Sequence, residues 1–227
     1  MREKKTILVV MSEGSKRDTI TVTLIRNHFN VHVAVAVKEA ISAADQLRPH
    51  MIILSMDLQG EAIIRSLRKS YDGPVLALSE SGEESVTVNA LDAGANDVLN
   101  LPFGRPEHMA RIRAALRYGS VFPSSVANGV FSVGGLSIDY ASRQVIVDGK
   151  KARLTPIEYR ILTFLTKNAG MVLTHDQIIN EVWGPYNSDN LVLRVNMANI
   201  RRKIEKIPSE PKYVLTEVGV GYRVVSE

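Results

Sequence analysis

The residues with the clearest chemical potential are cationic and lie close together near the C-terminus. Arg194, Arg201, Arg202 and Lys203 fall within ten residues of one another, and Asn199 lies among them. Guanidinium and amide groups bind phosphates and the base edges that line the major groove of DNA. This set therefore predicts contact with nucleic acid. The competing interpretation is a basic helix that is merely solvated, which is the usual role of a run of charges.

The segment from about Asn190 to Lys206 has the period of an amphipathic helix. One side of the helical wheel is apolar and should face a core; it carries Leu193, Met197, Ile200 and Ile204. The rest of the wheel combines charge with small side chains that permit close approach; it carries Arg194, Val195, Ala198, Asn199, Arg201 and Arg202. Such a helix is suited to the major groove.

Two capped helices are expected before this cationic helix. Thr155-Pro156-Ile157-Glu158 is a capping box with proline at the first helical position, so a helix should run from here to about Lys167. A second capping box, Thr174 to Gln177, should open a shorter helix that ends near Trp183.

Short strands are expected on both sides of the three helices. A hairpin is predicted over 213–225, with its turn at 219–221. Upstream, four short runs predict an antiparallel sheet over 131–133, 136–138, 144–147 and 152–154. A sheet, three helices and a terminal hairpin are the elements of a winged helix-turn-helix, a DNA-binding fold.

The first half of the chain alternates short apolar runs with segments of helical period. The runs, which should be strands, cover 6–11, 31–35, 51–54, 74–79 and 97–100. The segments between and after them, which should be helices, cover 16–28, 37–46, 61–70, 83–93 and 105–118. This alternation predicts a parallel, doubly wound α/β sheet. Functional residues of such sheets follow the carboxyl ends of the strands, which here carry Met11, Ser12, Ser55, Ser79 and Leu101.

Length and composition fit two soluble domains. The 227 residues exceed the usual size of one domain, so we expect a flavodoxin-like domain over 1–119, a linker over 120–129 and a winged-helix domain over 130–227. No apolar run is long enough to span a membrane, and the cytoplasm is the expected compartment. Lys and Arg exceed Asp and Glu by 28 to 24, with most of the excess in the second half.

The side chains present exclude several kinds of chemistry. Cysteine is absent, which excludes disulfides, thiol nucleophiles and thiolate zinc sites. The five histidines lack metal-ligand spacing, so neither a metal nor another cofactor is expected. The first strand is followed by the single Gly14 rather than by a glycine-rich phosphate loop, and no acid and base converge. We therefore expect no catalytic residues and no enzyme.

Several motifs of the C-terminal half occur together in a known family; they are Leu154–Tyr159, Asn168–Thr174, Val182–Gly184 and Val218–Arg223. Through them, residues 131–227 resemble the effector domain of the OmpR/PhoB response regulators. The arginine pattern from Leu193 to Lys203 is similar to that of the potassium-responsive KdpE type within this family. The resemblance implies that bases or major-groove phosphates are contacted by Arg194, Asn199, Arg201, Arg202 and Lys203.

The predicted wing departs from the family at one position. Members often carry a polar or basic residue where this chain has Val218, so minor-groove reading by that residue stays open. Arg223, which follows the wing, is implied either as a DNA phosphate contact or as a member of a structural ion pair. Trp183 and Tyr222 are interpreted as packing aromatics.

The N-terminal half resembles the receiver domain of the same family, through the motifs Leu78–Glu80, Ala90–Asp97 and Pro102–Gly104. The resemblance implies a parallel α/β fold. It also implies a phosphorylation site made of an acidic pair that holds Mg²⁺, an acceptor aspartate and a lysine.

This chain lacks the receiver's chemical groups at all of these positions. The acidic pair is replaced by Met11 and Ser12, the acceptor by Ser55 and the lysine by Leu101, while Ser79 matches the family's switch hydroxyl. Because no group remains to offset the charge of a transferring phosphoryl group, we expect a pseudo-receiver that cannot use aspartyl phosphorylation.

The resemblance further implies a receiver dimer that forms through helix four, strand five and helix five. The residues that match this face are Asp92, Asp97, Glu107, Arg111 and Arg113. Asp92 with Arg113 and Asp97 with Arg111 are the expected cross-subunit pairs. The alternative is ordinary surface charges, worth about 0–1 kcal/mol each.

The sequence thus predicts a regulator of transcription that binds duplex DNA as a homodimer, independently of phosphorylation. RNA polymerase is a candidate further partner, whereas a membrane is not, and the lost acceptor argues against a partner histidine kinase. An alternative keeps DNA binding but makes the pocket lined by Met11, Ser55 and Leu101 a sensor of a small molecule or a partner protein.

Overall fold

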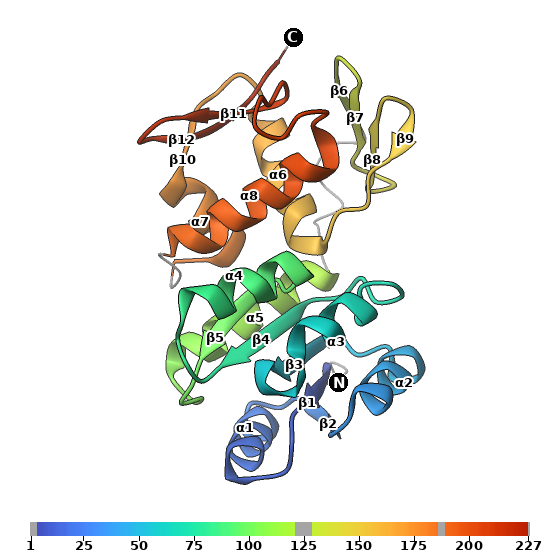
Figure 1. The fold of residues 1–227 in the computed structure, drawn as a ribbon, viewed down its shortest axis with the longest axis vertical. Helices are drawn as coiled ribbons and strands as arrows, with labels where there is room; N and C mark the ends of the chain where they lie inside the picture. Colours follow the sequence, from blue (N-terminus) through green and yellow to red (C-terminus); the bar gives the residue numbers. More distant parts are fainter. Residues whose placement is uncertain (1–3, 121–128, 186–188, 227) are drawn as a thin grey trace. The chain divides into compact units, whose positions relative to one another are not determined.

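The chain folds into two compact units, residues 1–120 and 121–227, which we call the N-terminal and C-terminal domains (Figure 1). The computed structural model describes residues 4–120, 129–185 and 189–226, with only the backbone of 117–120.

The N-terminal domain is built on a five-stranded parallel sheet with the strand order β2-β1-β3-β4-β5. Its strands are β1 Thr6–Val10, β2 Asn30–Ala34, β3 Met51–Ser55, β4 Val75–Ser79 and β5 Asp97–Asn100. Its helices are α1 Ser15–Arg26, α2 Val37–Leu47, α3 Gly60–Leu67, α4 Glu84–Ala93 and α5 Pro106–Ser120, with a short 3₁₀ turn, η1, over Met56–Leu58. The predicted receiver fold is confirmed.

The sheet is apolar on both faces because helices cover both. Every residue of β3 and β4 is buried, as expected for central strands of a parallel sheet. One face packs against α1 and α5, through Ile20, Ile112 and Leu116 among others. The neighbouring helices α2, α3 and α4 cover the other face. The core therefore fixes the carboxyl ends of the strands, where the candidate receiver site lies.

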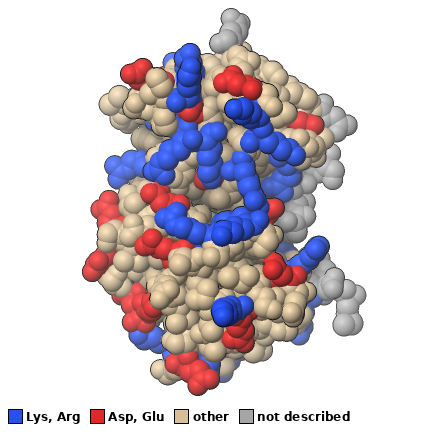
Figure 2. All heavy atoms as spheres, turned by 45° about the vertical axis from the view of Figure 1, so that its right-hand side comes forward, with Lys and Arg blue, Asp and Glu red and all other residues tan. Residues whose placement is uncertain are grey.

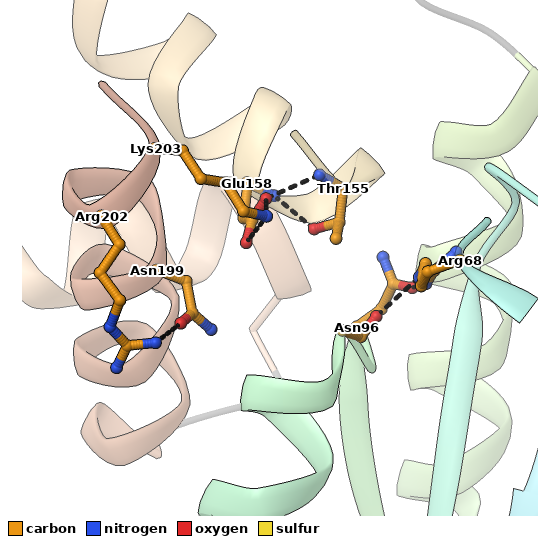
Figure 3. A network of polar contacts seen from close by, with 8 residues as sticks. Arg68, Asn96, Thr155, Glu158, Asn199, Arg202 and Lys203 are labelled. Carbon is orange, nitrogen blue, oxygen red and sulfur yellow. Dashed lines mark hydrogen bonds and ion pairs between the residues drawn. The ribbon is translucent and has the colours of Figure 1, made fainter. Parts of the chain in front are cut away.

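A polar link ties α3 to the start of β5. The side-chain oxygen of buried Asn96 accepts hydrogen bonds from the Val75 amide and from Arg68 Nη2 (Figure 3), both at 2.7 Å. Arg68 also donates to the carbonyls of Gly94 at 2.9 Å and Gly73 at 2.6 Å. The loops that precede β4 and β5 thus share one guanidinium group.

The C-terminal domain contains two antiparallel sheets and three helices, and the second sheet takes one short strand from between the first and second of these helices. The first sheet contains β6 Val130–Val133, β7 Leu136–Asp139, β8 Gln144–Val147 and β9 Lys150–Lys151. The helices are α6 Pro156–Lys167, α7 His175–Trp183 and α8 Asn190–Ile204. The second sheet has the order β10-β12-β11, with β10 Leu173–Thr174, β11 Val214–Glu217 and β12 Gly221–Val224. This is the predicted winged helix-turn-helix.

Both predicted capping boxes are present. The Thr155 hydroxyl accepts from the Glu158 amide, and the Glu158 carboxylate accepts from the Thr155 amide at 2.7 Å. Thr174 and Gln177 make the same reciprocal pair at the start of α7. Local chemistry therefore fixes where α6 and α7 begin.

The strand predicted over 152–154 is wrong. Pairing follows the tight turn at Asp148 and Gly149, both at positive φ, so β9 occupies Lys150–Lys151 instead. The chain then leaves the sheet to reach the helix cap at Thr155. The extra strand β10 was not foreseen and joins the hairpin of β11 and β12.

The linker predicted over 120–129 is described only in part. Helix α5 includes Ser120, and residues 121–128 lie outside the described residues.

We predict that Asn96→Ala lowers the free energy of unfolding of the N-terminal domain by about 1–3 kcal/mol, because the buried Val75 amide and the partly buried Arg68 guanidinium lose their shared acceptor. Urea unfolding followed by circular dichroism measures the loss. The single tryptophan, Trp183, lies in the other domain, and its fluorescence marks that domain's own transition. Asn100→Ala, at an exposed position of β5, is the matched control and should change stability by no more than about 0.5 kcal/mol. Equal effects of the two variants would contradict the role of the link.

Candidate nucleic-acid interface

Helix α8 is anchored to the domain by its apolar side. Asp189 caps it by accepting from the Leu191 amide at 2.8 Å. The predicted apolar residues Leu193, Met197, Ile200 and Ile204 are all buried, at no more than 1% exposure, which confirms this part of the wheel. The orientation of α8 in the domain therefore follows from hydrophobic burial.

Two arginines and a small residue form a stripe along the opposite side of α8. Arg194, Ala198 and Arg202 are spaced four residues apart and so share one side of the helix; both arginines are exposed. Among the described residues, the Arg194 side chain has no hydrogen-bond or ion-pair partner. On the face of the C-terminal domain drawn in the upper part of Figure 2, basic side chains predominate over acidic ones. We call Arg194, Ala198 and Arg202 the arginine stripe.

Arg201 is engaged inside the domain. Its Nε and Nη2 donate to the Val214 carbonyl at 3.0 and 2.7 Å, and Nη2 also donates to the Thr216 hydroxyl at 2.7 Å. The guanidinium carbon lies 5.7 Å from the centre of the Tyr222 ring, and burial lowers the pKa of Arg201. The side chain expected to reach DNA thus links α8 to β11.

Lys203 is engaged in the same way with α6. Its Nζ lies 2.7 and 2.6 Å from the two carboxylate oxygens of Glu158, whose side chain is only 3% exposed. Figure 3 shows Glu158 between Lys203 and Thr155. One carboxylate therefore completes a helix cap and neutralises a cation of α8.

Asn199 and Val195 differ from the wheel prediction, because both are buried. On the wheel they lie next to Val192 and Asn196, which are also buried, so the covered side of α8 is wider than the apolar stripe. The Asn199 side-chain oxygen accepts a hydrogen bond from Arg202 (Figure 3). Asn199 therefore supports Arg202.

The wing carries an ion pair at its base and an apolar tip. Arg223 Nη2 and Nε donate to Glu217 at 2.7 and 2.9 Å. Of the two roles considered for Arg223, a DNA phosphate contact or a structural ion pair, this contact is the ion pair. Val218 is 91% exposed, and Gly219 follows it at a φ of +74°. The hairpin therefore projects an isopropyl group at its turn.

The N-terminal domain brings the predicted pocket residues to the carboxyl edge of the sheet. Ser55 is 2% exposed, and its hydroxyl donates to the Asp57 carboxylate at 3.1 Å while accepting from the Asp57 amide. Ser79 and Met11 are buried as well, Leu101 is partly buried and Ser12 is exposed. The hydroxyl at the acceptor position is thus occupied by a neighbouring carboxylate.

A depression of about 330 Å³ lies beside Ser79 between η1, α3 and α4. It is acidic; its lining includes Asp57, Glu61, Glu80 and Glu83. Of the predicted pocket residues only Ser79 lines it. Lys16 Nζ lies 2.5 Å from the carboxylate of Glu80. Among the described residues, no group of acidic residues and histidines is arranged to hold a metal ion.

The residues expected at a dimer face already pair within the chain. Arg111 lies 3.1 Å from Asp97 and 2.6 Å from Glu107. Burial acts to lower the pKa of Arg111, but these two carboxylates raise it above the ordinary value. Arg113 donates to the Asn27 side chain at the end of α1 at 2.9 Å, and Asp92 is partly buried.

Glu205 is a site residue that sequence reasoning missed. Its carboxylate accepts from the amides of Lys212, Tyr213 and Val214 at 2.8–2.9 Å, and it is 7% exposed. The sequence signal was weak: one acidic residue directly after a cationic helix, before a stretch that contains two prolines.

A parallel α/β domain, followed by a winged helix with a cationic helix, defines a two-domain response regulator. A model described as "Response regulator receiver domain" matches residues 7–113. A second model, "Transcriptional regulatory protein, C terminal", matches residues 149–224.

Curated relatives match almost the whole chain. KdpE of Mycobacterium tuberculosis is 36% identical over 221 residues, which is 96% of this chain and 97% of that protein. KdpE of Escherichia coli is 37% identical, again over 96% of this chain and 97% of that protein. The DNA-binding response regulator MtrA of Mycolicibacterium smegmatis is 32% identical over 98% of this chain and 97% of its own.

Solved structures share the fold. A RitR mutant superposes with a TM-score of 0.77 at 21% identity, over 98% of this chain and all of its own. DrrB of Thermotoga maritima, an OmpR/PhoB homologue, gives a TM-score of 0.50 at 25% identity over the same shares. The chain belongs to the OmpR/PhoB family of response regulators. Its relatives are regulators of transcription and not enzymes, as expected. None of the helices among residues 4–120, 129–185 and 189–226 is long and apolar enough to cross a membrane.

We predict that Lys203→Ala destabilises the C-terminal domain by about 1–2 kcal/mol, because the buried Glu158 carboxylate loses its cation. The loss is smaller than for a fully buried pair because Lys203 is 34% exposed. Urea unfolding followed by Trp183 fluorescence measures it. Lys206→Ala removes an exposed cation nearby and serves as the control, with an expected change below about 0.5 kcal/mol. If the two variants unfold at the same urea concentration, the Glu158 pair contributes nothing.

Proposed function

We propose that the protein regulates transcription by placing the arginine stripe of α8 in the major groove of duplex DNA, with the β11–β12 wing beside it. The arginine stripe carries this proposal: two exposed guanidinium groups flank Ala198, which leaves room for close approach to base edges. Family membership supports it, since MtrA is described as DNA-binding. Arg201, Lys203 and Arg223 then act by holding α8 and the wing in place.

We further propose that the receiver domain works without aspartyl phosphorylation. Ser55 stands at the acceptor position with a hydroxyl in place of a carboxylate, so no aspartyl phosphate can form there, and this hydroxyl is already hydrogen-bonded to Asp57. Met11, Ser12 and Leu101 supply no carboxylate or ammonium to hold Mg²⁺ or to offset phosphoryl charge. The acidic depression beside Ser79 also repels an incoming phosphate. These observations weigh against a partner histidine kinase.

The proposed active form is a homodimer assembled through α4, β5 and α5. The support is the pattern of charges on this face, with Asp92, Asp97, Glu107, Arg111 and Arg113. Because Arg111 is held by its own Asp97 and Glu107, it must share these carboxylates when it meets a second copy. A dimer would place two α8 helices on half-sites about one helical turn apart. RNA polymerase is a further candidate partner.

A second candidate function keeps DNA binding and adds sensing of a small molecule or partner protein by the receiver domain. The depression of about 330 Å³ at the carboxyl ends of β3 and β4 favours it, because parallel sheets bind ligands at this edge. Thermal-shift screening of the full chain separates the two candidate functions. A ligand that raises the unfolding temperature supports sensing.

We predict that Arg194→Ala weakens binding to a selected duplex by about 1–3 kcal/mol and relaxes the sequence preference at one position, because a base contact is lost. The duplex is selected by the unsubstituted protein from a random-sequence pool, and affinity is measured by fluorescence anisotropy. Lys150→Ala, which removes one cation from the β9 hairpin, is matched in charge and should change affinity far less. If both variants lose the same affinity for the duplex, Arg194 contributes only its positive charge and no base contact.

We also predict that acetyl phosphate with Mg²⁺ changes neither the sedimentation of the protein nor its affinity for the selected duplex, because no acceptor or cation site responds. Untreated protein at micromolar concentration should already sediment as a dimer. A phosphorylatable relative treated in parallel shows that the reagent is active. A treated protein that dimerises or binds more tightly would reject phosphorylation independence, and a purely monomeric untreated protein would reject the dimer.

A further inference from the structure

The last turn of α8 and the first residues of β11 are joined by side chains rather than by main-chain pairing. Strand β11 is the outer strand of its sheet, paired on one side with β12. Its other side faces Arg201 of α8 and Glu205, the residue that follows the helix. The wing is therefore connected to the cationic helix at a point outside the hairpin's own hydrogen-bond ladder.

Arg201 and Glu205 together hold both polar groups of the Val214 peptide backbone. The Val214 amide donates to Glu205 Oε1 at 2.9 Å. The Val214 carbonyl accepts from Arg201 Nε and Nη2 at 3.0 and 2.7 Å. We call this arrangement the Val214 clamp. Because donor and acceptor are both taken, β11 is fixed in position and in direction relative to α8.

Neighbouring contacts extend the clamp along the strand. Glu205 also accepts from the amides of Lys212 and Tyr213, at 2.8 and 2.9 Å. Arg201 reaches forward to the Thr216 hydroxyl and lies over the ring of Tyr222 on β12. The two side chains thus contact both strands of the wing, and Glu205 is nearly buried while Arg201 is half-buried.

We infer that Arg201 and Glu205 are positioning residues that set the distance between α8 and the wing, so that both fit one duplex. This inference rests on the proposed DNA binding. It assigns Arg201 to the protein side of the interface, in contrast to the arginine stripe. It also gives a negatively charged residue, Glu205, a favourable role in binding a polyanion.

The sign of the Glu205→Gln effect distinguishes positioning from simple electrostatics. Removing a negative charge near DNA should tighten binding if charge alone matters. If the Val214 clamp positions the wing, the amide of glutamine cannot accept from three backbone amides, and affinity should fall by about tenfold. The measurement uses the full chain and a labelled duplex of about 30 bp, selected from a random pool, which holds two half-sites one helical turn apart. Unchanged or tighter binding overturns the inference.

The salt dependence of Arg201 variants tests the same point independently. A phosphate contact by Arg201 would make the slope of log affinity against log salt shallower by about 0.9 in Arg201→Ala. The Val214 clamp predicts weaker binding with an unchanged slope. Arg201→Lys keeps the charge but loses the planar fork, so it should remain weakened. A shallower slope, or full affinity of Arg201→Lys, overturns the inference.

Amide hydrogen exchange separates a local effect from unfolding. In Glu205→Gln and Arg201→Lys, exchange should accelerate at Lys212, Tyr213 and Val214 and stay unchanged within α8. Trp183 fluorescence confirms that each variant remains folded; if Arg201→Ala unfolds, the two milder variants decide. Unchanged exchange at the three amides overturns the Val214 clamp. An unsubstituted protein that binds no duplex at all would instead reject the proposed function.

Discussion

The C-terminal domain depends on how the positive charge at the end of α8 is held. Arg201, Arg202 and Lys203 are consecutive, and like charges at this spacing repel one another. Two nearly buried carboxylates lie against this turn. Glu158 forms an ion pair with Lys203, and Glu205 lies close to Arg201. Each also accepts from backbone amides, so each carboxylate both offsets charge and fixes geometry. Helix α8 is thereby held on its apolar side and at its C-terminal end.

The fold was predictable because its determinants are local. The capping boxes at Thr155 and Thr174 specify where α6 and α7 begin through residues three apart in the chain. The buried runs of β3 and β4 identify central parallel strands. Strand β9 was misplaced because the Asp148-Gly149 turn determines which residues pair, and apolar character does not. The two-residue strand β10 has no period of its own and exists only through pairing with β12.

The candidate site was only partly predictable, because residue type does not reveal which partner a charge will find. Arg194 and Arg201 look equivalent in the sequence, yet one is exposed and the other holds a backbone carbonyl thirteen residues away. Lys203 meets a carboxylate 45 residues earlier. Asp97 and Arg111 match the positions of a cross-subunit ion pair in the sequence, yet in the structure they form an ion pair within one chain. Long-range packing decides among these roles.

The Val214 clamp also has a consequence for solubility. An outer strand usually presents free amide and carbonyl groups, which can recruit a strand of another molecule and start edge-to-edge aggregation. At the outer edge of β11 the Val214 peptide is already occupied by Glu205 and Arg201, so a foreign strand cannot add there without displacing two charged side chains. The same contacts that position the wing therefore also shield the start of β11 from the addition of a foreign strand.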